Sequence, residues 1–331
     1  MKIIVDKDIP YIKDRILRGE VTYLPAAEIT PESVRDADAL IVRTRTHCDE
    51  NLLGNSDVKF VATATIGTDH IDLPWCESKG IKVTNAPGCN APGVAQYVLT
   101  SLFQLGFDPE KDSLGIVGYG NVGQIVAKWA KQIGIKTLIS DLPRREAGRK
   151  DVEYLNLEEV LEKSDAVTLH VPLTDSGDYP TIGLIGEKEL KLMKPGGVIV
   201  NSSRGGVVNE EALKKFLKSG VLKGVTDVWI NEPNIDKELL QFSEVATPHI
   251  AGYASEGKMR ATSMSLKNLN EAFGIPVDLS GLECKEPKEM SVSLRSLQES
   301  YNPLIDTENL KNNPDSFEKL RNNYHYRHEP S

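Results

Sequence analysis

The sequence is poor in the features that mark secreted, membrane and nucleic-acid-binding proteins. It has only four cysteines in 331 residues, without a CxxC pair or another metal-binding spacing. We therefore expect reduced thiols, no metal site and a cytoplasmic protein. No apolar run approaches the roughly 20 residues of a membrane span, and residues 1–10 have the pattern of a strand rather than a signal peptide. A net charge of −9 argues against general affinity for nucleic acid.

What the sequence does contain is an alternation of apolar strands and helical patterns that runs to about residue 275. A hydrophobic fraction of 40% and a charged fraction of 26% are ordinary for a globular protein, and the length suffices for two domains. Strands separated by helices form parallel βαβ units, so the sequence predicts an α/β protein. The first expected strands cover residues 2–5, 21–24, 39–42, 60–65 and 81–84, with a helix over 31–37.

Residues 113–141 have the pattern of a dinucleotide-binding unit: strand, GYGNVG turn, amphipathic helix, strand, acid. Gly118 allows the tight turn, Gly120 lets the backbone approach a pyrophosphate, and Gly123 lets the helix pack closely on the strand. The helix begins at Asn121 and Val122, where free N–H groups can bind phosphate. This stretch therefore predicts a Rossmann nucleotide domain.

The acid at the end of this stretch indicates which dinucleotide binds. Asp141 lies 18 residues after Gly123, where a carboxylate can accept hydrogen bonds from both ribose hydroxyls of NAD. Arg144 and Arg145 are close enough in sequence to hold a 2′-phosphate, but the carboxylate would repel that group. We therefore expect NAD rather than NADP.

The order of these patterns predicts a chain of three parts. Residues 1–92 should form a flavodoxin-like α/β substrate domain, and residues 93–254 a doubly wound Rossmann domain. A helical pattern over 255–275 should return to the first domain, which makes that domain discontinuous. Residues 278–331 lose the alternation but keep apolar helical spacing near their end, and they predict a small C-terminal appendage.

Three later segments place an arginine, a carboxylate and a histidine directly after expected strands. Arg204 follows strand 198–202, Glu232 follows 224–229, and His249 follows the short run 245–248. A guanidinium can hold a substrate carboxylate, an imidazole can exchange a proton with a hydroxyl, and a neighbouring carboxylate orients the imidazole. Because the carboxyl ends of parallel strands share one edge, the set should converge there on the nicotinamide. It suits hydride transfer at a 2-hydroxy or 2-oxo acid.

Polar or small residues also follow the strands of the first part. Arg43 and Thr44 follow strand 39–42, and Thr65 and Gly67 lie at the end of strand 60–65. Ligands of open parallel sheets bind at these ends. We expect substrate contacts there, and we hypothesise that Arg43 or Arg45 binds an anionic group of the substrate.

These motifs together resemble the D-2-hydroxyacid dehydrogenase family, over residues 1 to about 275. The matching segments are GYGNVG at 118–123, NSSRG at 201–205, DVW with EP at 227–233, and PHIAG at 248–252. The resemblance implies that Arg204 binds substrate, that Glu232 pairs with His249, and that His249 is the acid/base. It also implies cofactor contacts at Asp141, Asp227 and Gly252, and substrate contacts at Thr44, Thr65 and Tyr253.

Within this family, four segments are most similar to the members that oxidise 4-phospho-D-erythronate in vitamin B6 biosynthesis. They are MKIIVD at 1–6, TATIGTDH at 63–70, APGCN at 86–90, and HIAGY at 249–253 followed by Glu256-Gly257-Lys258. Residues 317–324 resemble the dimerisation domain of those members, so a homodimer is implied, although the C-terminal part is shorter here. Gln96 stands where those members commonly have a glutamate.

Two other functions stay open at this point. One is a dehydrogenase of 3-phosphoglycerate, glycerate or another D-2-hydroxyacid. The other is a non-catalytic NAD-sensing module, like the corepressors that share this fold and keep its catalytic residues.

Overall fold

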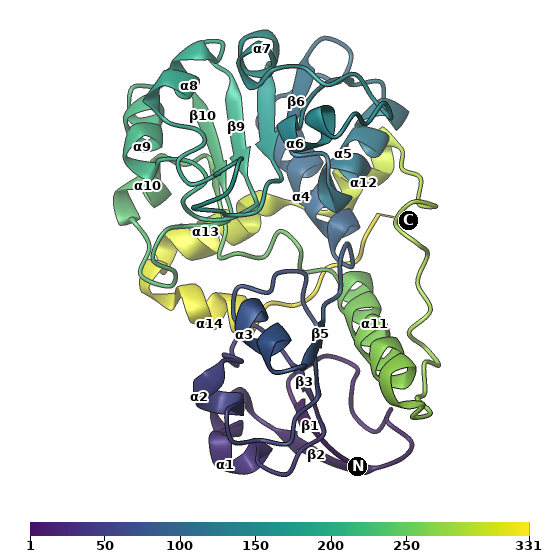
Figure 1. Cartoon of the computed structure of the whole chain (residues 1–331). Coiled ribbons are helices and arrows are strands. Elements are labelled where there is room, and N and C mark those ends of the chain that lie inside the picture. The colour runs from purple at the N-terminus through teal and green to yellow at the C-terminus, as the bar shows by residue number, and fades with distance from the viewer. Residues whose placement is uncertain (331) are drawn as a thin grey trace. The chain divides into compact units, whose positions relative to one another are not determined.

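The computed structural model describes residues 1–330, which form two compact units (Figure 1). The first unit comprises residues 1–90 and 254–287, and the second comprises residues 91–253 and 288–330. Among the described residues, no helix is long and apolar enough to cross a membrane.

The first unit is built on a parallel five-stranded sheet with the order β2-β1-β3-β4-β5. This is the flavodoxin-like order that the sequence predicts. Every residue of β3 and β4 is buried, as expected for a sheet covered on both faces. The strands are β1 (Lys2–Asp6), β2 (Glu20–Leu24), β3 (Ala39–Val42), β4 (Phe60–Thr63) and β5 (Lys82–Thr84). Since β4 ends at Thr63, Thr65 lies in the bend beyond the strand.

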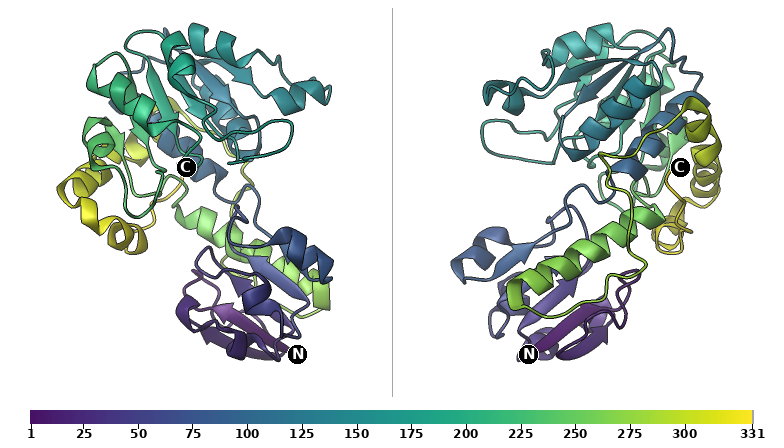
Figure 2. Two further views of the ribbon diagram at one scale, coloured as in Figure 1. Left: turned by 60° about the vertical axis from the view of Figure 1, so that its left-hand side comes forward. Right: turned by 90° about the vertical axis from the view of Figure 1, so that its right-hand side faces the viewer.

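Helices cover the first sheet, and the longest comes from the far end of the chain. The helix α11 (Ser255–Phe273) lies along the sheet of the first unit (Figure 2), and its Leu266 and Leu269 belong to the same buried apolar cluster as Ile3 and Phe60. It ends at Gly274, whose left-handed backbone stops the helix. The short helices are α1 (Pro31–Val34), α2 (Glu50–Leu53) and α3 (Leu73–Ser78). The helix expected over 31–37 thus stops at Val34, because the chain turns there to enter β3.

The second unit is built on a parallel six-stranded sheet with the order β11-β10-β9-β8-β6-β7. Strand order reverses between β6 and β8, which makes the end of β6 the topological switch point where ligands of such sheets bind. The strands are β6 (Ser113–Val117), β7 (Lys136–Ser140), β8 (Ala166–Leu169), β9 (Val198–Asn201), β10 (Lys223–Thr226) and β11 (Val245–Ala246).

Two hydrophobic cores lie against this sheet. One joins α4 (Ala91–Gln104) and α5 (Asn121–Gln132) to β6, with Tyr97 and Trp129 fully buried. The other is formed with the remaining connecting helices and surrounds Leu161 and Leu213. Those helices are α7 (Leu157–Lys163), α8 (Glu187–Leu192), α9 (Glu210–Lys218) and α10 (Lys237–Phe242), whereas the short α6 (Leu142–Glu146) has no buried residue.

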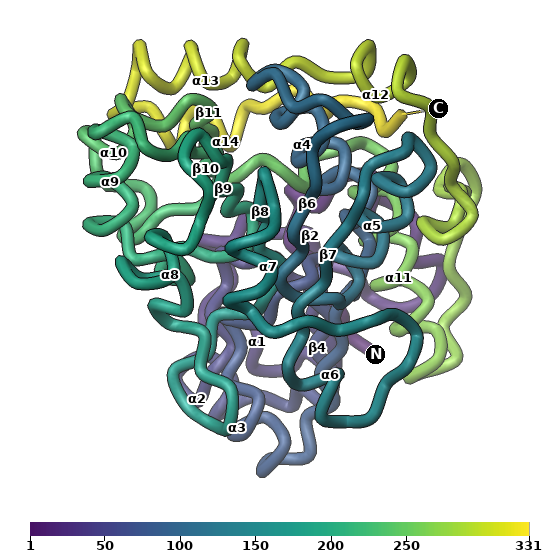
Figure 3. Tube along the Cα trace, turned by 90° about the horizontal axis from the view of Figure 1, so that it is seen from above, coloured from purple at the N-terminus to yellow at the C-terminus, as the bar shows by residue number. Residues whose placement is uncertain are grey.

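The C-terminal residues share these cores. The sequence predicts a separate appendage over 278–331, whereas residues 278–287 belong to the first unit and 288–330 to the second. The helices α12 (Leu294–Ser300) and α13 (Pro303–Asn312) run beside α4 and β11, and α14 (Phe317–Asn322) follows them (Figure 3). Leu297, Leu310 and Phe317 are completely buried in the second unit.

Candidate active site

The glycine turn after β6 has the geometry that a dinucleotide needs. Gly118 has a φ of +91°, and a Cβ there would lie 2.7 Å from the carbonyl oxygen of His170. A Cβ at Gly123 would overlap the carbonyl oxygen of Gly118. At Gly120, by contrast, no described atom outside the adjoining chain lies within 4 Å of such a Cβ. Gly118 and Gly123 are therefore required by the fold itself, whereas Gly120 borders open space.

The start of α5 fits a pyrophosphate. Gly120 is the N-cap residue, and among the described residues no side chain accepts a hydrogen bond at this cap. Asn121 and Val122 begin the helix, so unpaired N–H groups and the positive end of the helix dipole meet the open space at Gly120. The residues present fit the diphosphate of NAD.

Asp141 lies beside this turn, as expected. Its Oδ2 accepts a hydrogen bond from the Tyr119 N–H at 2.7 Å, and its Oδ1 accepts one from the Arg144 N–H at 3.0 Å, which caps α6. The Arg144 guanidinium lies over the Tyr119 ring, with Nε 3.9 Å from Asp141 Oδ2. The carboxylate and a cation thus stand together where the adenosine ribose is expected.

His249 and Glu232 form a hydrogen-bonded pair. The Nδ1 of His249 lies 2.9 Å from Glu232 Oε2 and 3.1 Å from Oε1. The Trp229 N–H also donates to Oε1, at 3.0 Å. Burial favours the protonated carboxyl, but the hydrogen bond and charge of His249 outweigh it, so the pKa of Glu232 is lowered. The pair leaves Nε2 of the imidazole to exchange a proton with a substrate.

Asp227 anchors the loop that carries His249. This fully buried carboxylate accepts hydrogen bonds from the Ile250 N–H at 2.7 Å, the Ala251 N–H at 3.0 Å and the Thr247 hydroxyl at 2.7 Å. Burial raises the pKa of Asp227, against the opposing effects of His249 and these bonds. The sequence predicts only a cofactor contact here and misses the anchoring role.

Arg204 lies on the neighbouring loop. Its Nη1 donates to the Ser203 carbonyl at 2.9 Å, and the Asn201 side chain donates to the Arg204 carbonyl at 3.0 Å. A Cβ at Gly205 would overlap the carbonyl of Trp229, so the loops after β9 and β10 are in direct contact. The structure thus brings the segments that carry Arg204, Glu232 and His249 to one edge of the sheet.

Tyr253 and Gly252 follow His249, and Tyr253 meets a residue that the sequence did not single out. Arg321, in α14, donates from Nε to the Tyr253 hydroxyl at 3.2 Å and lies 3.6 Å from Glu232 Oε2. The rings of Tyr324 and Tyr326 pack edge-on against Tyr253. The apolar helical spacing of residues 317–324 was the available signal, and it indicated a helix but no site residue.

In the first unit, Arg43 is held by acids. It donates from Nε to Oδ2 of the buried Asp6 at 2.9 Å, and from Nη2 to Asp8 at 3.0 Å. This ion pair joins the ends of β1 and β3, a role that sequence reasoning did not foresee. Thr44 is the second residue after β3, as expected.

Thr65 belongs to a hydrogen-bonded chain. Its hydroxyl lies 2.7 Å from that of Thr63, which lies 3.0 Å from Nε2 of His70. Thr65 also donates to the Gly67 carbonyl at 3.1 Å. Burial lowers the pKa of His70 to about 4, so the ring is neutral at pH 7 and orients the hydroxyls.

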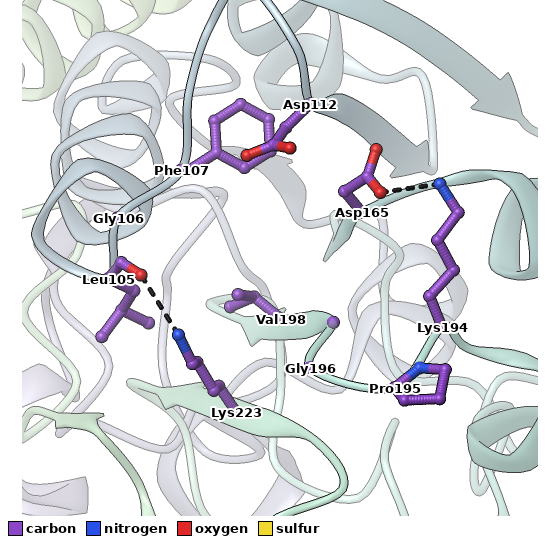
Figure 4. A pocket seen from close by; sticks show the side chains of 11 residues that line it. Leu105, Gly106, Phe107, Asp112, Asp165, Lys194, Pro195, Gly196, Val198 and Lys223 are labelled. Atoms are coloured by element: carbon purple, nitrogen blue, oxygen red, sulfur yellow. Dashed lines mark hydrogen bonds and ion pairs between the residues drawn. The ribbon is translucent and has the colours of Figure 1, made fainter.

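A pocket lies at the amino end of the strands of the six-stranded sheet, opposite the edge that carries Arg204, Glu232 and His249 (Figure 4). Its charges are already paired, since Lys194 binds Asp165 at 2.7 Å and Lys223 donates to the Leu105 carbonyl at 3.3 Å. None of the predicted site residues lines it. Within residues 1–330, no cluster of three His, Cys, Asp or Glu side chains could hold a metal.

Comparison with known proteins gives consistent results. The profile of the "D-isomer specific 2-hydroxyacid dehydrogenase, NAD binding domain" matches residues 97–251. The chain is 46% identical to the erythronate-4-phosphate dehydrogenase of Bacteroides fragilis, over 99% of this chain and 97% of that protein. It is 42% identical to the protein of that name from Bacteroides thetaiotaomicron, with the same coverage.

Solved structures are similar over most of the chain. The TT0316 protein of Thermus thermophilus matches with a TM-score of 0.71 and 27% identity, over 83% of this chain and 98% of that chain. The 3-phosphoglycerate dehydrogenase of Entamoeba histolytica, solved with NAD⁺, matches with a TM-score of 0.70 and 27% identity, over 86% and 99%.

Proposed function

Because the chain belongs to the erythronate-4-phosphate dehydrogenases, within the D-isomer specific 2-hydroxyacid dehydrogenase family, we propose that it oxidises 4-phospho-D-erythronate with NAD. The product is 3-hydroxy-2-oxo-4-phosphooxybutanoate, in the synthesis of pyridoxal 5′-phosphate. The observation that carries the proposal is the pair of His249 and Glu232, 2.9 Å apart at the edge of a nucleotide-binding sheet.

His249 is the acid/base in this proposal. Its Nε2 takes the proton of the C2 hydroxyl, and the imidazolium that forms is stabilised by the ionised Glu232. Arg204 holds the substrate carboxylate and polarises the C2 oxygen, which suits its planar fork of N–H groups. When bound, NAD accepts the hydride that leaves C2.

Cofactor and substrate contacts follow from the same assignment. The turn residues Gly118, Gly120, Asn121, Val122 and Gly123 hold the diphosphate, and Asp141 holds the ribose. Asp227 and Gly252 are assigned to the nicotinamide end. Thr44, Thr65 and Tyr253 are assigned to the substrate, and Arg43 or Arg45 to its phosphate.

We further propose a cytoplasmic homodimer that uses the C-terminal residues. The support is the exposed pair of apolar side chains on α13, where Ile305 is 60% and Leu304 37% exposed. In this proposal the pair lies in the dimer contact, where association would remove its apolar surface from water.

The test is NADH production with 4-phospho-D-erythronate, run beside 3-phosphoglycerate, D-glycerate and D-lactate. Preference for the erythronate, abolished in His249→Ala, supports the proposal. Equal activity on 3-phosphoglycerate would assign the protein to that substrate instead. NADH binding without turnover of any of the four would favour the NAD-sensing module.

A further inference from the structure

The loop of residues 249–253 carries the imidazole but has no regular secondary structure of its own. Its first N–H groups face Asp227: His249 donates to the Asp227 carbonyl at 2.8 Å, and Ile250 and Ala251 donate to the carboxylate. His249 also has a φ of +58°, a left-handed backbone that is strained for a residue with a side chain. Such a residue persists only where its surroundings hold it.

The carbonyl groups of the same loop face Arg327, near the C-terminus. Its Nη1 donates to the Ile250 carbonyl at 3.0 Å and to the Tyr253 carbonyl at 3.4 Å, and its Nη2 donates to the Ala251 carbonyl. The loop thus lies between two opposite charges. A carboxylate accepts from its N–H groups, and a guanidinium donates to its carbonyls.

Further contacts hold Arg327 itself in place. Its Nη2 donates to the Gly93 carbonyl at 3.0 Å, its Nε donates to Gln96 Oε1 at 2.8 Å, and its Cζ lies 4.4 Å from the centre of the Tyr301 ring. The amide of the buried Gln96 donates in turn to the His328 carbonyl at 2.9 Å. Arg327 therefore joins the C-terminal tail both to α4 and to the loop of residues 249–253, the histidine loop.

The hydrogen-bond acceptors around position 327 require an arginine side chain. A guanidinium has five N–H donors in a fixed plane, and here they serve four backbone carbonyl groups, the Gln96 amide oxygen and the Tyr324 hydroxyl. A lysine has three donors around one atom and cannot reach such widely separated acceptors at once.

We propose that Arg327 is a positioning residue for the acid/base: with Asp227 it clamps residues 250–253 and so fixes the direction of the His249 imidazole. The clamp rests on the function proposed above, because it acts only through His249. It also gives the C-terminal tail a part in turnover that is separate from dimer formation.

The experiment measures kcat and KM for 4-phospho-D-erythronate, and the Kd for NADH, in the full-length protein. We expect Arg327→Met to lower kcat about 100-fold, since small misplacement of a catalytic group costs that much, and to leave the Kd for NADH unchanged. Free guanidinium ion should restore part of the kcat of Arg327→Ala. Gln96→Leu, which removes the hydrogen bonds of Gln96 to Arg327 and to the His328 carbonyl but leaves the guanidinium itself, should lower kcat less.

Two controls separate the possible outcomes. Arg295→Met removes an exposed arginine of the same C-terminal region and should leave kcat unchanged. His249→Ala tests the proposed function itself: if it stays active, the acid/base assignment fails, whereas its inactivity beside a fully active Arg327→Met overturns only the clamp. Parallel losses of kcat, NADH affinity and melting temperature without rescue by guanidinium would also overturn it. If Arg327→Met does not fold, Arg327→Lys is measured against the same expectations.

Discussion

The chemistry of individual residues in this protein depends on how charges are paired. Glu232 stays ionised although it is largely buried, because His249 donates to it and Arg321 lies 3.6 Å away. Asp227, which is fully buried, accepts hydrogen bonds from two N–H groups and a hydroxyl. The two carboxylates differ in function for this reason: one orients the imidazole and the other orients the loop.

Glu232→Gln should preserve the shape of the pair but remove its charge. We expect kcat/KM for 4-phospho-D-erythronate to fall about 100-fold or more, because the imidazolium formed during oxidation loses its counter-ion. Steady-state kinetics at pH 8 checks this, with the exposed Glu211→Gln as the matched control. A loss of less than threefold would contradict the assigned role of Glu232.

Asp141→Ser should weaken the preference for NAD. Hydrogen bonds to a charged group contribute about 1.5–3 kcal/mol, so kcat/KM with NAD should fall roughly 10- to 100-fold. The loss with NADP should be smaller, because Arg144 lies beside the lost carboxylate and can pair with a 2′-phosphate. The ratio of kcat/KM for the two cofactors is the measurement, and an unchanged ratio would refute the assignment of Asp141 to the ribose.

His70 should make the protein sensitive to acid. Burial lowers its pKa to about 4 in the folded state, whereas the usual value of about 6.5 applies to the unfolded chain. The folded state therefore binds fewer protons between these values, and stability that is present above pH 6.5 is lost as the pH falls toward 4. When the pH is lowered from 7 to 4.5, the free energy of unfolding should fall in both proteins. We expect this fall to be roughly 2–3 kcal/mol smaller in His70→Gln than in the wild type.

Urea unfolding at the two pH values measures this difference, with the exposed His325→Gln as control. Equal losses in wild type and His70→Gln would show that His70 is not kept neutral by the fold.

Among the structural elements, the glycine turn shows most clearly how a motif divides between folding and binding. The three glycines of GYGNVG look alike in the sequence. In the structure, Gly118 and Gly123 are pressed against backbone, whereas Gly120 borders open space. Only Gly118 and Gly123 are needed for the turn and the helix to form.

Two alanine variants should therefore behave in opposite ways. Gly123→Ala should lower the free energy of unfolding by about 1–3 kcal/mol, because the added methyl overlaps the Gly118 carbonyl. Gly120→Ala should melt like the wild type, since its φ of −78° suits alanine, yet bind NADH at least about tenfold more weakly, or ~1.4 kcal/mol. Calorimetry and NADH fluorescence titration check the two, and a destabilised Gly120→Ala would contradict this division.

The C-terminal helices show that a local sequence pattern can predict a helix without predicting what the helix contacts. Apolar spacing in residues 317–324 correctly indicated a helix, realised as α14 (Phe317–Asn322). Spacing reports which face is buried, but it does not report what that face meets. The contacts of Arg321 and Arg327 with the histidine loop join residues about 70 positions apart, and no local pattern encodes them.

For the chain as a whole, the proposed homodimer can be tested by a substitution on α13. Ile305→Lys places a charge on the exposed apolar pair of α13 and should convert a dimer, of twice 36.5 kDa, into monomers of 36.5 kDa. Sedimentation equilibrium measures the mass, and Leu17→Lys, at an equally exposed apolar position in the first unit, is the control. A dimer that survives Ile305→Lys would assign the interface to another surface.

The α/β fold with its two parallel-sheet domains and the family could be predicted from local patterns, because strand periodicity, glycine turns and polar strand ends each depend on neighbouring residues. GYGNVG with Asp141, and the segments around Arg204, Glu232 and His249, belong to this class. Tertiary structure alone decided how the histidine loop is held, that Arg43 is paired with Asp6, and that the C-terminal residues share the cores of the two units. Those features join distant segments through buried charges and carbonyl groups, and such pairings exist only once the chain has folded.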